Sequence, residues 1–144
     1  MNISINPEFR ALIPPLSPEE YVQLDRKARV EAGQTIVANV SLSSPDLALI
    51  EWAEANGKLV YIGDNVRFQP RWKRSDWYNP DKMGEDRSEA KRNAVCDAYE
   101  KRLNNRPDLL ARLPELKGKV LGCWCYPLRC HGHYLASLAN EVQS

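Results

Sequence analysis

The stretch KVLGCWCYPLRCHGHYLASL, residues 119–138, decides the predicted fold. Its apolar beginning predicts a strand over 119–124, Pro127 turns the chain, and a helix is expected to begin near Cys130. A second short apolar strand is predicted over 58–62. Because helical segments separate the two strands, the chain crosses over between them, which favours a parallel pair. The carboxyl ends of parallel strands open on one edge of a sheet, where ligands bind in open α/β sheets.

Helix-start signals occur around these strands. Ser17-Pro18-Glu19-Glu20 is a capping box with proline at the first helical position, and it predicts a helix over 18–32. An extended run is expected over 35–40. We therefore expect an α/β fold with a small, mainly parallel sheet flanked by helices. Further helices are predicted after Ser44-Pro45-Asp46, after Asp86, and over 107–113.

The composition is that of one soluble domain. The chain has 144 residues, of which 43% are apolar and 27% are charged, and a chain of this length can bury a sizeable core. No apolar run approaches the roughly 20 residues of a membrane span, and the first residues contain no apolar signal core. We therefore expect a cytoplasmic protein with no membrane partner.

Charge is distributed unevenly along the chain. Residues 1–57 carry 4 basic and 8 acidic side chains, whereas residues 58–144 carry 16 basic and 11 acidic ones. This change separates an N-terminal helical segment, 1–57, from an α/β domain, 58–144, and the two are expected to form one compact unit. An anionic ligand is expected to bind to the basic C-terminal part.

Three of the four cysteines and both histidines fall between residues 123 and 133. Thiolate and imidazole suit zinc or iron, and a closed tetrahedral site needs four such ligands. Cys123 and Cys125 project from the same face of a strand, and Cys130 lies near a helix N-terminus, which favours its thiolate. His131 is the expected fourth ligand, with His133 as the second choice. The sequence therefore predicts a zinc site at a strand-to-helix junction, with iron as the alternative metal.

Two other interpretations of the cysteines remain open. Cys123 to Arg129 fits Cys-x5-Arg, a spacing by which a strand-to-helix loop holds a phosphate against a thiolate nucleophile. The loop here contains a proline and no glycine. Buried free cysteines are also common small apolar residues in protein cores, and Cys96 is expected to be one of them.

A basic and aromatic loop follows the strand predicted at 58–62. Residues 67–77, RFQPRWKRSDW, carry four cations and three aromatic rings. Because cations neutralise phosphates and rings stack on bases, the loop is expected to bind a nucleotide or nucleic acid beside the metal site. The alternative is that its tryptophans cover the edge of the sheet. The expected ligand-binding residues are Arg67, Arg71, Trp72, Arg74, Trp77 and Asn79.

The C-terminal part of the chain, from about residue 59 to residue 140, resembles the bacterial and phage family called domain of unknown function 4326. The resemblance implies that Cys123, Cys125, Cys130 and His131 are the hallmark positions of that family. It also places His133 where members tend to have an acidic residue, which favours His131 as the fourth ligand. The matching motifs are VYIG at 60–63, SDWYNP at 75–80, and LKGKVLGCWC at 116–125 with Cys130 and His131 following.

The segment 5–21, INPEFRALIPPLSPEEY, resembles the opening of the ParB-like nuclease superfamily, a DNA-associated fold. Only about the first strand and helix of such a domain are covered. The Gly-His-His-Arg type of motif found later in those domains is absent, so the resemblance implies no nuclease activity. It implies a segment that packs on the C-terminal domain.

Three functions are compatible with these observations. The first is a bacterial or phage-type zinc-binding α/β protein that binds a nucleotide or nucleic acid. The second is a nucleotide- or nucleobase-modifying enzyme in which Cys130 or a metal-bound water reacts, while Arg67, Arg71 and Asn79 orient the substrate. The third is an interaction module with a structural zinc, whose acidic N-terminal helix binds a protein partner. Four protein ligands would make the metal structural; whether the chain is an enzyme stays open.

Overall fold

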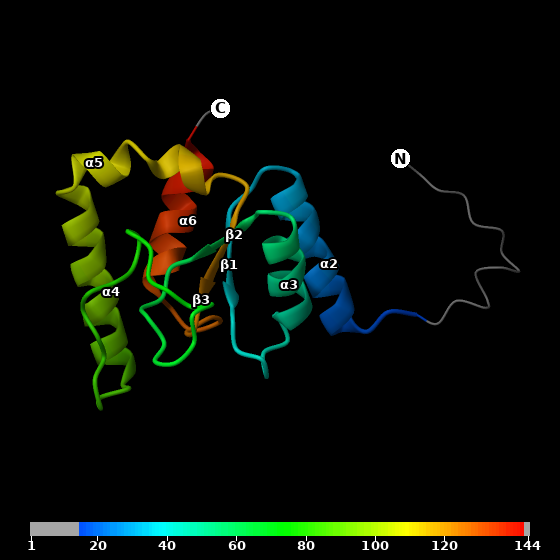
Figure 1. Cartoon of the computed structure of the whole chain (residues 1–144), viewed down its shortest axis with the longest axis horizontal. Coiled ribbons are helices and arrows are strands. Elements are labelled where there is room, and N and C mark those ends of the chain that lie inside the picture. The colour runs from blue at the N-terminus through cyan, green and yellow to red at the C-terminus, as the bar shows by residue number, and fades with distance from the viewer. Residues whose placement is uncertain (1–14, 143–144) are drawn as a thin grey trace, which may run out of the picture.

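The computed structural model describes residues 15–142 and contains a sheet of three parallel strands (Figure 1). β3 (Val120–Cys123) lies in the centre, between β1 (Ile36–Asn39) and β2 (Leu59–Tyr61). Leu121 of β3 pairs with Val37 on one side and with Val60 on the other. The expected α/β fold with a small parallel sheet is confirmed.

Helices cover both faces of the sheet (Figure 1). α2 and α3 pack on one face, whereas α6 packs on the other and α4 lies beyond it. A short helix, α5, and a 3-10 helix, η1, connect α4 to β3. The helices are α2 (Pro18–Glu31), α3 (Leu47–Ala55), α4 (Glu89–Asn104), α5 (Pro107–Leu110), η1 (Leu113–Leu116) and α6 (His131–Glu141).

Successive residues of each strand face two separate cores. Val37 of β1 and Leu121 of β3 are buried with residues of α4 and α6, such as Leu135. Ala38, which follows Val37, and Val120, which precedes Leu121, are buried with residues of α2 and α3. This alternation is the period of a β-strand, and it places one helical layer on each face. Burial of each large aliphatic side chain stabilises the fold by roughly 1.5–3 kcal/mol.

The helix starts follow the sequence signals where those signals are local. The capping box of α2 is formed, because Ser17 Oγ accepts from the backbone N–H of Glu20 and Glu20 Oε1 accepts from that of Ser17, each at 3.2 Å. α4 begins at Glu89 after Ser88, whose Oγ accepts from the N–H of Lys91. The predicted cap at Asp86 is therefore two residues early.

The segments 1–57 and 58–144 contribute to the same sheet, because β1 comes from the first and β3 from the second. Residues 5–14 of the ParB-like segment lie outside the described residues. Between residues 15 and 142, no helix has the length and apolar character that a membrane span requires.

Candidate functional site

A cavity of about 410 Å³ opens at the carboxyl edge of the sheet. Its walls come from the residues that follow β2, the end of β3, the loop between β2 and α4 (green in Figure 1), α4 itself and the start of α6. The position is the one at which open parallel sheets bind ligands. All four cysteines line this cavity: Cys96, Cys123, Cys125 and Cys130.

Cys123 and Cys130 form a thiol pair on the wall of the cavity. Their Sγ atoms lie 3.5 Å apart, and both side chains are buried. The hydrogen bond donated by the Cys130 thiol, together with the backbone N–H groups of Tyr126 and Cys125, lowers the pKa of Cys123 to about 7 against the effect of burial. The same bond, together with burial, raises the pKa of Cys130. Cys123 is therefore the cysteine of the pair that ionises first, while Cys130 keeps its proton.

Cys125 does not share a strand with Cys123, which corrects the expectation from the sequence. β3 ends at Cys123, so the alternation of strand side chains stops there. Trp124 is exposed, and its indole N–H donates to the hydroxyl of Tyr61 at 2.7 Å. Cys125 is half-buried at the cavity wall, in the loop that leads to α6.

The two histidines bind backbone atoms. The Nε2 atom of His131 lies 2.9 Å from the carbonyl oxygen of Ile62, and its ring packs 4.5 Å from the ring of Tyr99. Burial lowers the pKa of His131 to about 4, so the ring is neutral and Nε2 carries the proton that this carbonyl accepts. His133 Nδ1 accepts from the N–H of Cys130 at 3.0 Å, at the start of α6.

The predicted metal ligands do not form a tetrahedral site in this conformation. Within residues 15–142, no three Cys, His, Asp or Glu side chains lie close enough together to hold a metal ion. Cys123 and Cys130 are adjacent, but the Nε2 atom of His131 is hydrogen-bonded to Ile62. The structure therefore presents a thiol pair, with Cys125 and Cys96 on the same cavity.

Asn39 holds the loop that carries Cys125. Its Nδ2 donates to the carbonyl of Tyr126 at 2.8 Å and to that of Trp124 at 3.2 Å. The backbone N–H of Asn39 in turn donates to Asp46 Oδ2 at 2.8 Å. The guanidinium of Arg26, which is paired with Asp46, lies 4.6 Å from the centre of the Tyr126 ring. Residues of α2 and β1 thus support one wall of the cavity.

The charges around the cavity are predominantly positive. Lys82 is paired with Asp64, its Nζ lying 2.6 Å from Oδ2. Arg87 is exposed, and Arg92 donates to the carbonyl of Arg129 at 3.3 Å. Neither Arg87 nor Arg92 forms an ion pair with another residue of the described range 15–142. The charged residues of the wall are Lys82, Arg87, Arg92, Arg129, Asp64 and Asp81.

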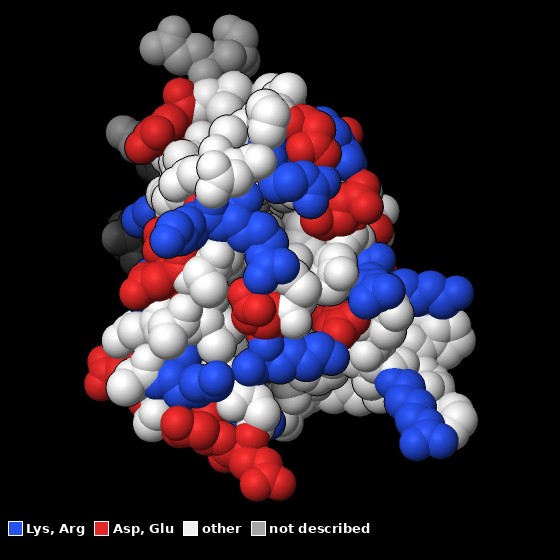
Figure 2. Space-filling model, turned by 90° about the vertical axis from the view of Figure 1, so that its left-hand side faces the viewer, with Lys and Arg blue, Asp and Glu red and all other residues white. Residues whose placement is uncertain are grey.

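Arg129 does not serve a phosphate loop. Its guanidinium binds three residues of α4, namely Asn93 at 3.0 Å, Asp97 at 2.8 Å and Glu100 at 2.9 Å. In the Cys-x5-Arg arrangement the guanidinium would instead face the phosphate held against the thiolate. Figure 2 views the molecule from the α4 side, where basic and acidic side chains alternate over the surface. This face is therefore no continuous basic patch.

The two tryptophans of the basic and aromatic loop are core residues. Trp72 and Trp77 are 4% and 3% exposed, in the two different cores. The ring of Trp72 packs 5.0 Å from that of Tyr61, at the end of β2. Their aromatic faces are covered by the protein, which agrees with the alternative in which they cover the sheet.

The remaining predicted ligand-binding residues are dispersed. Arg71 binds Glu54 through two hydrogen bonds of 3.1 and 3.0 Å, and Arg74 lies 3.8 Å from Asp64. Arg67 is exposed. Of the six predicted residues, Asn79 lines the cavity beside the cysteines.

Sequence reasoning missed the cationic and thiol face of α4. Arg92 and Cys96 both line the cavity, and they stand four residues apart. Residues at this spacing lie on one face of a helix, so the pair was detectable as a candidate site. Arg87, from the residues just before α4, had no such signal.

The family model described as "Domain of unknown function (DUF4326)" matches residues 51–141, which is more than half of the chain. The match includes every residue named on the cavity wall. No curated protein and no solved structure matches this chain. The comparisons give no support to the ParB-like resemblance of residues 5–21, which precede the matched region.

Proposed function

We propose that this chain, which belongs to the DUF4326 family, binds a phosphate-bearing nucleotide in the cavity at the carboxyl edge of its sheet. The observation that carries the proposal is the convergence of cations, an amide and four cysteines on one cavity of about 410 Å³. Small-molecule sites have volumes of roughly 300–1,000 Å³ and combine an apolar lining with a few polar groups. A mononucleotide fits this range.

The phosphate is assigned to Arg87 and Arg92. These two cations lack an acidic partner among residues 15–142, whereas Lys82 and Arg129 at the same cavity are neutralised by Asp64 and by residues of α4. A guanidinium without a carboxylate partner is free to form charge-assisted hydrogen bonds with a phosphate. The amide of Asn79, on the same wall, donates to the carbonyl of Val95 at 3.5 Å and accepts from the N–H of Asp81 at 3.0 Å, and each end can form one further hydrogen bond with a nucleobase edge.

Calorimetric titration with the four ribonucleoside monophosphates tests this proposal, with inorganic phosphate as the control ligand. We expect Arg87→Gln and Arg92→Gln each to weaken nucleotide binding about tenfold, the effect of losing one charged hydrogen bond. Lys101→Gln is the matched control, because Lys101 is an exposed cation at the far end of α4. Absence of nucleotide binding, or equal losses in all three variants, contradicts the proposal.

A nucleotide- or nucleobase-modifying activity is the catalytic form of the same proposal. It is supported by the thiol pair of Cys123 and Cys130, which is placed against the volume that the nucleotide would occupy. Incubation with each nucleotide, followed by mass spectrometry of protein and ligand, tests it. A changed ligand, or an adduct that is lost in Cys123→Ser, the variant without the cysteine that ionises first, supports an enzyme; an unchanged ligand supports a binding protein.

Metal binding by the thiols is the second candidate, and one distance favours it. Two sulfur atoms bound at about 2.3 Å to one tetrahedral zinc ion stand roughly 3.8 Å apart, and those of Cys123 and Cys130 stand 3.5 Å apart. Cys125 would be the third ligand, and His131 the fourth once its bond to Ile62 is released. Elemental analysis of the purified protein should then give one zinc or iron per chain, lost in Cys123→Ser. Metal-free protein after zinc titration contradicts this candidate.

A further inference from the structure

Phe68 is an exposed aromatic residue at the tip of a tight turn after β2. Its side chain is 87% exposed, and its backbone φ is 64°. A bulky residue rarely adopts this left-handed conformation, because its Cβ crowds the backbone. Strained positions of this kind occur preferentially at binding sites, so Phe68 is a candidate ligand-binding residue.

The turn that carries Phe68 is rigidly supported. The N–H of Val66 donates to the carbonyl of Trp72 at 3.0 Å, and the N–H of Trp72 donates to that of Gln69 at 3.1 Å. Gln69 also donates to Val66, with which it forms a bridge. Trp72 is buried in the core between the sheet and the helices α2 and α3. The ring of Phe68 is thus presented to solvent from a fixed base.

Arg67 lies over the exposed ring, and Lys73 lines the same surface hollow as Phe68. Residues 65–75 contain four cations and no carboxylate. Arg71 and Arg74 are paired with Glu54 and Asp64, but Arg67 and Lys73 form no ion pair within the described part of the chain. The guanidinium of Arg67 lies 4.8 Å from the centre of the Phe68 ring. The turn therefore offers one aromatic face and two free positive charges.

From this arrangement we infer that Phe68, Arg67 and Lys73 form a stacking site for single-stranded nucleic acid. A base stacks on the ring, and the two cations neutralise the flanking phosphates. A single strand is required because bases in a duplex are stacked on one another and expose no face. A protein partner would need a contiguous apolar patch, whereas Arg67 and Gln69, which flank Phe68, are charged and polar, and Pro70 is the one exposed apolar residue beside it on the turn.

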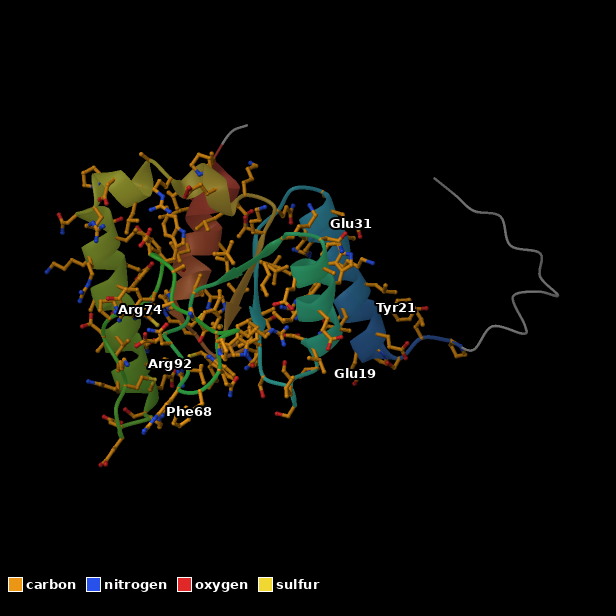
Figure 3. The ribbon with its side chains drawn as sticks, viewed as in Figure 1. Glu19, Tyr21, Glu31, Phe68, Arg74 and Arg92 are labelled. Carbon is orange, nitrogen blue, oxygen red and sulfur yellow. The ribbon has the colours of Figure 1, made fainter. Side chains whose placement is uncertain are left out.

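This inference extends the proposed function from a single nucleotide to a nucleic-acid strand. It rests on the proposed function in one respect, because the nucleotide in the cavity is taken to be one unit of the bound strand. Asp64 connects the two sites, because it lines the cavity and also pairs with Arg74 near the turn. In Figure 3, Phe68, Arg74 and Arg92 lie on one side of the molecule, whereas Tyr21 lies at the opposite side, on α2. A strand bound on this side would reach from the turn to the cavity.

Fluorescence anisotropy with a labelled oligothymidylate of about 20 nucleotides tests the inference. We expect Phe68→Ala to weaken binding about tenfold and Phe68→Trp to retain it, because only an aromatic side chain provides a face on which a base stacks. Phe68→Gly should weaken binding equally while raising the melting temperature, because glycine accepts the positive φ. The double variant of Arg67→Gln with Lys73→Gln should lower the slope of log affinity against log salt by about 1.4.

Tyr21→Ala is the matched control, since Tyr21 is also an exposed aromatic residue, at 58%, but on α2. It should bind the oligonucleotide as the native chain does, and a duplex of equal length should bind more weakly than the single strand. If Phe68→Ala and Phe68→Gly bind the oligonucleotide as well as the native chain, the inference is overturned. If these variants lose oligonucleotide binding while Arg87→Gln and Arg92→Gln leave mononucleotide binding intact, the inference holds and the proposed cavity site fails.

Discussion

The Sγ atoms of Cys123 and Cys130 lie 3.5 Å apart, one at the end of the central strand and the other at the start of α6. The loop between them returns the chain to the same point on the cavity wall. Because the thiol of Cys130 donates to Cys123, the pKa of Cys123 is lowered and that of Cys130 is raised.

Removal of this donor should raise the pKa of Cys123. Cys130→Ala removes the hydrogen bond that is the largest cause of the lowered pKa of Cys123. Burial, which raises this pKa, is then no longer opposed by that bond. A pH titration followed by the ultraviolet absorbance of the thiolate measures this pKa. We expect the pKa of Cys123 in Cys130→Ala to lie above the native value of about 7. Cys130→Ser keeps a donor and should titrate as the native chain does; equal titration in both variants argues against the bond.

Asn39 is predicted to be a stabilising clamp for the cysteine loop. Asn39→Ala removes two hydrogen bonds to the carbonyls of Trp124 and Tyr126, and it should lower the free energy of unfolding by about 1–3 kcal/mol. Asn39→Asp replaces the donor by an acceptor that faces the same carbonyls, so its loss should be larger. Urea denaturation measures both, and a smaller loss for Asn39→Asp contradicts this role.

The buried ion pair of Arg26 and Asp46 should be sensitive to loss of one partner. Asp46 accepts hydrogen bonds from Arg26, from Gln23 and from the N–H of Asn39. In Asp46→Ala the guanidinium of Arg26 stays buried without a counter-charge, which should cost about 3–5 kcal/mol in unfolding experiments. Asp25→Ala is the control, since Asp25 pairs with Arg29 on the exposed surface of α2 and should change stability by less than about 1 kcal/mol.

His131 should make the fold less stable in weak acid. Its pKa of about 4 in the folded chain lies below the ordinary value of 6.5, because burial disfavours the charged ring. As pH falls below 6.5, the histidine binds a proton in the unfolded chain before it does so in the folded chain. The contribution of His131 to the free energy of unfolding is therefore complete above pH 6.5 and is lost as pH falls to about 4. This loss amounts to about 3 kcal/mol. His131→Gln keeps a hydrogen-bond donor for Ile62 but has no titrating ring. Denaturant titrations of this variant should not show the loss of stability between pH 6.5 and 4, and an equal loss would contradict the role of His131.

The features that the sequence predicted correctly depend on neighbouring residues. The capping box at Ser17 and the apolar strand that ends at Tyr61 are read from short windows, and the structure contains both. Asp46 shows where such reasoning ends. The signal Ser44-Pro45-Asp46 predicts a capped helix start, but α3 begins at Leu47 with no side-chain cap, and the carboxylate of Asp46 binds Arg26, which is 20 positions earlier in the chain.

The candidate site was predictable in position and in some of its members, since Asn79, Cys123, Cys125, Cys130 and His131 line the cavity. The carboxyl edge of the sheet follows from the parallel strands, and the cysteines fall there. Residue type alone cannot distinguish a tryptophan that stacks on a base from one that fills a core, and Trp72 and Trp77 fill cores. His131 adjoins Cys130 in sequence, yet the start of α6 directs its ring toward Ile62, a contact between distant parts of the chain.

The most direct test of the central claim locates the nucleotide in the cavity. Cys125 is half-buried on the cavity wall, and its alkylation by iodoacetamide can be followed by mass spectrometry with and without a nucleoside monophosphate. We predict that the nucleotide slows alkylation of Cys125 in proportion to the bound fraction, and that Arg92→Gln needs a higher nucleotide concentration for the same protection. An unchanged alkylation rate at saturating nucleotide would contradict binding in this cavity.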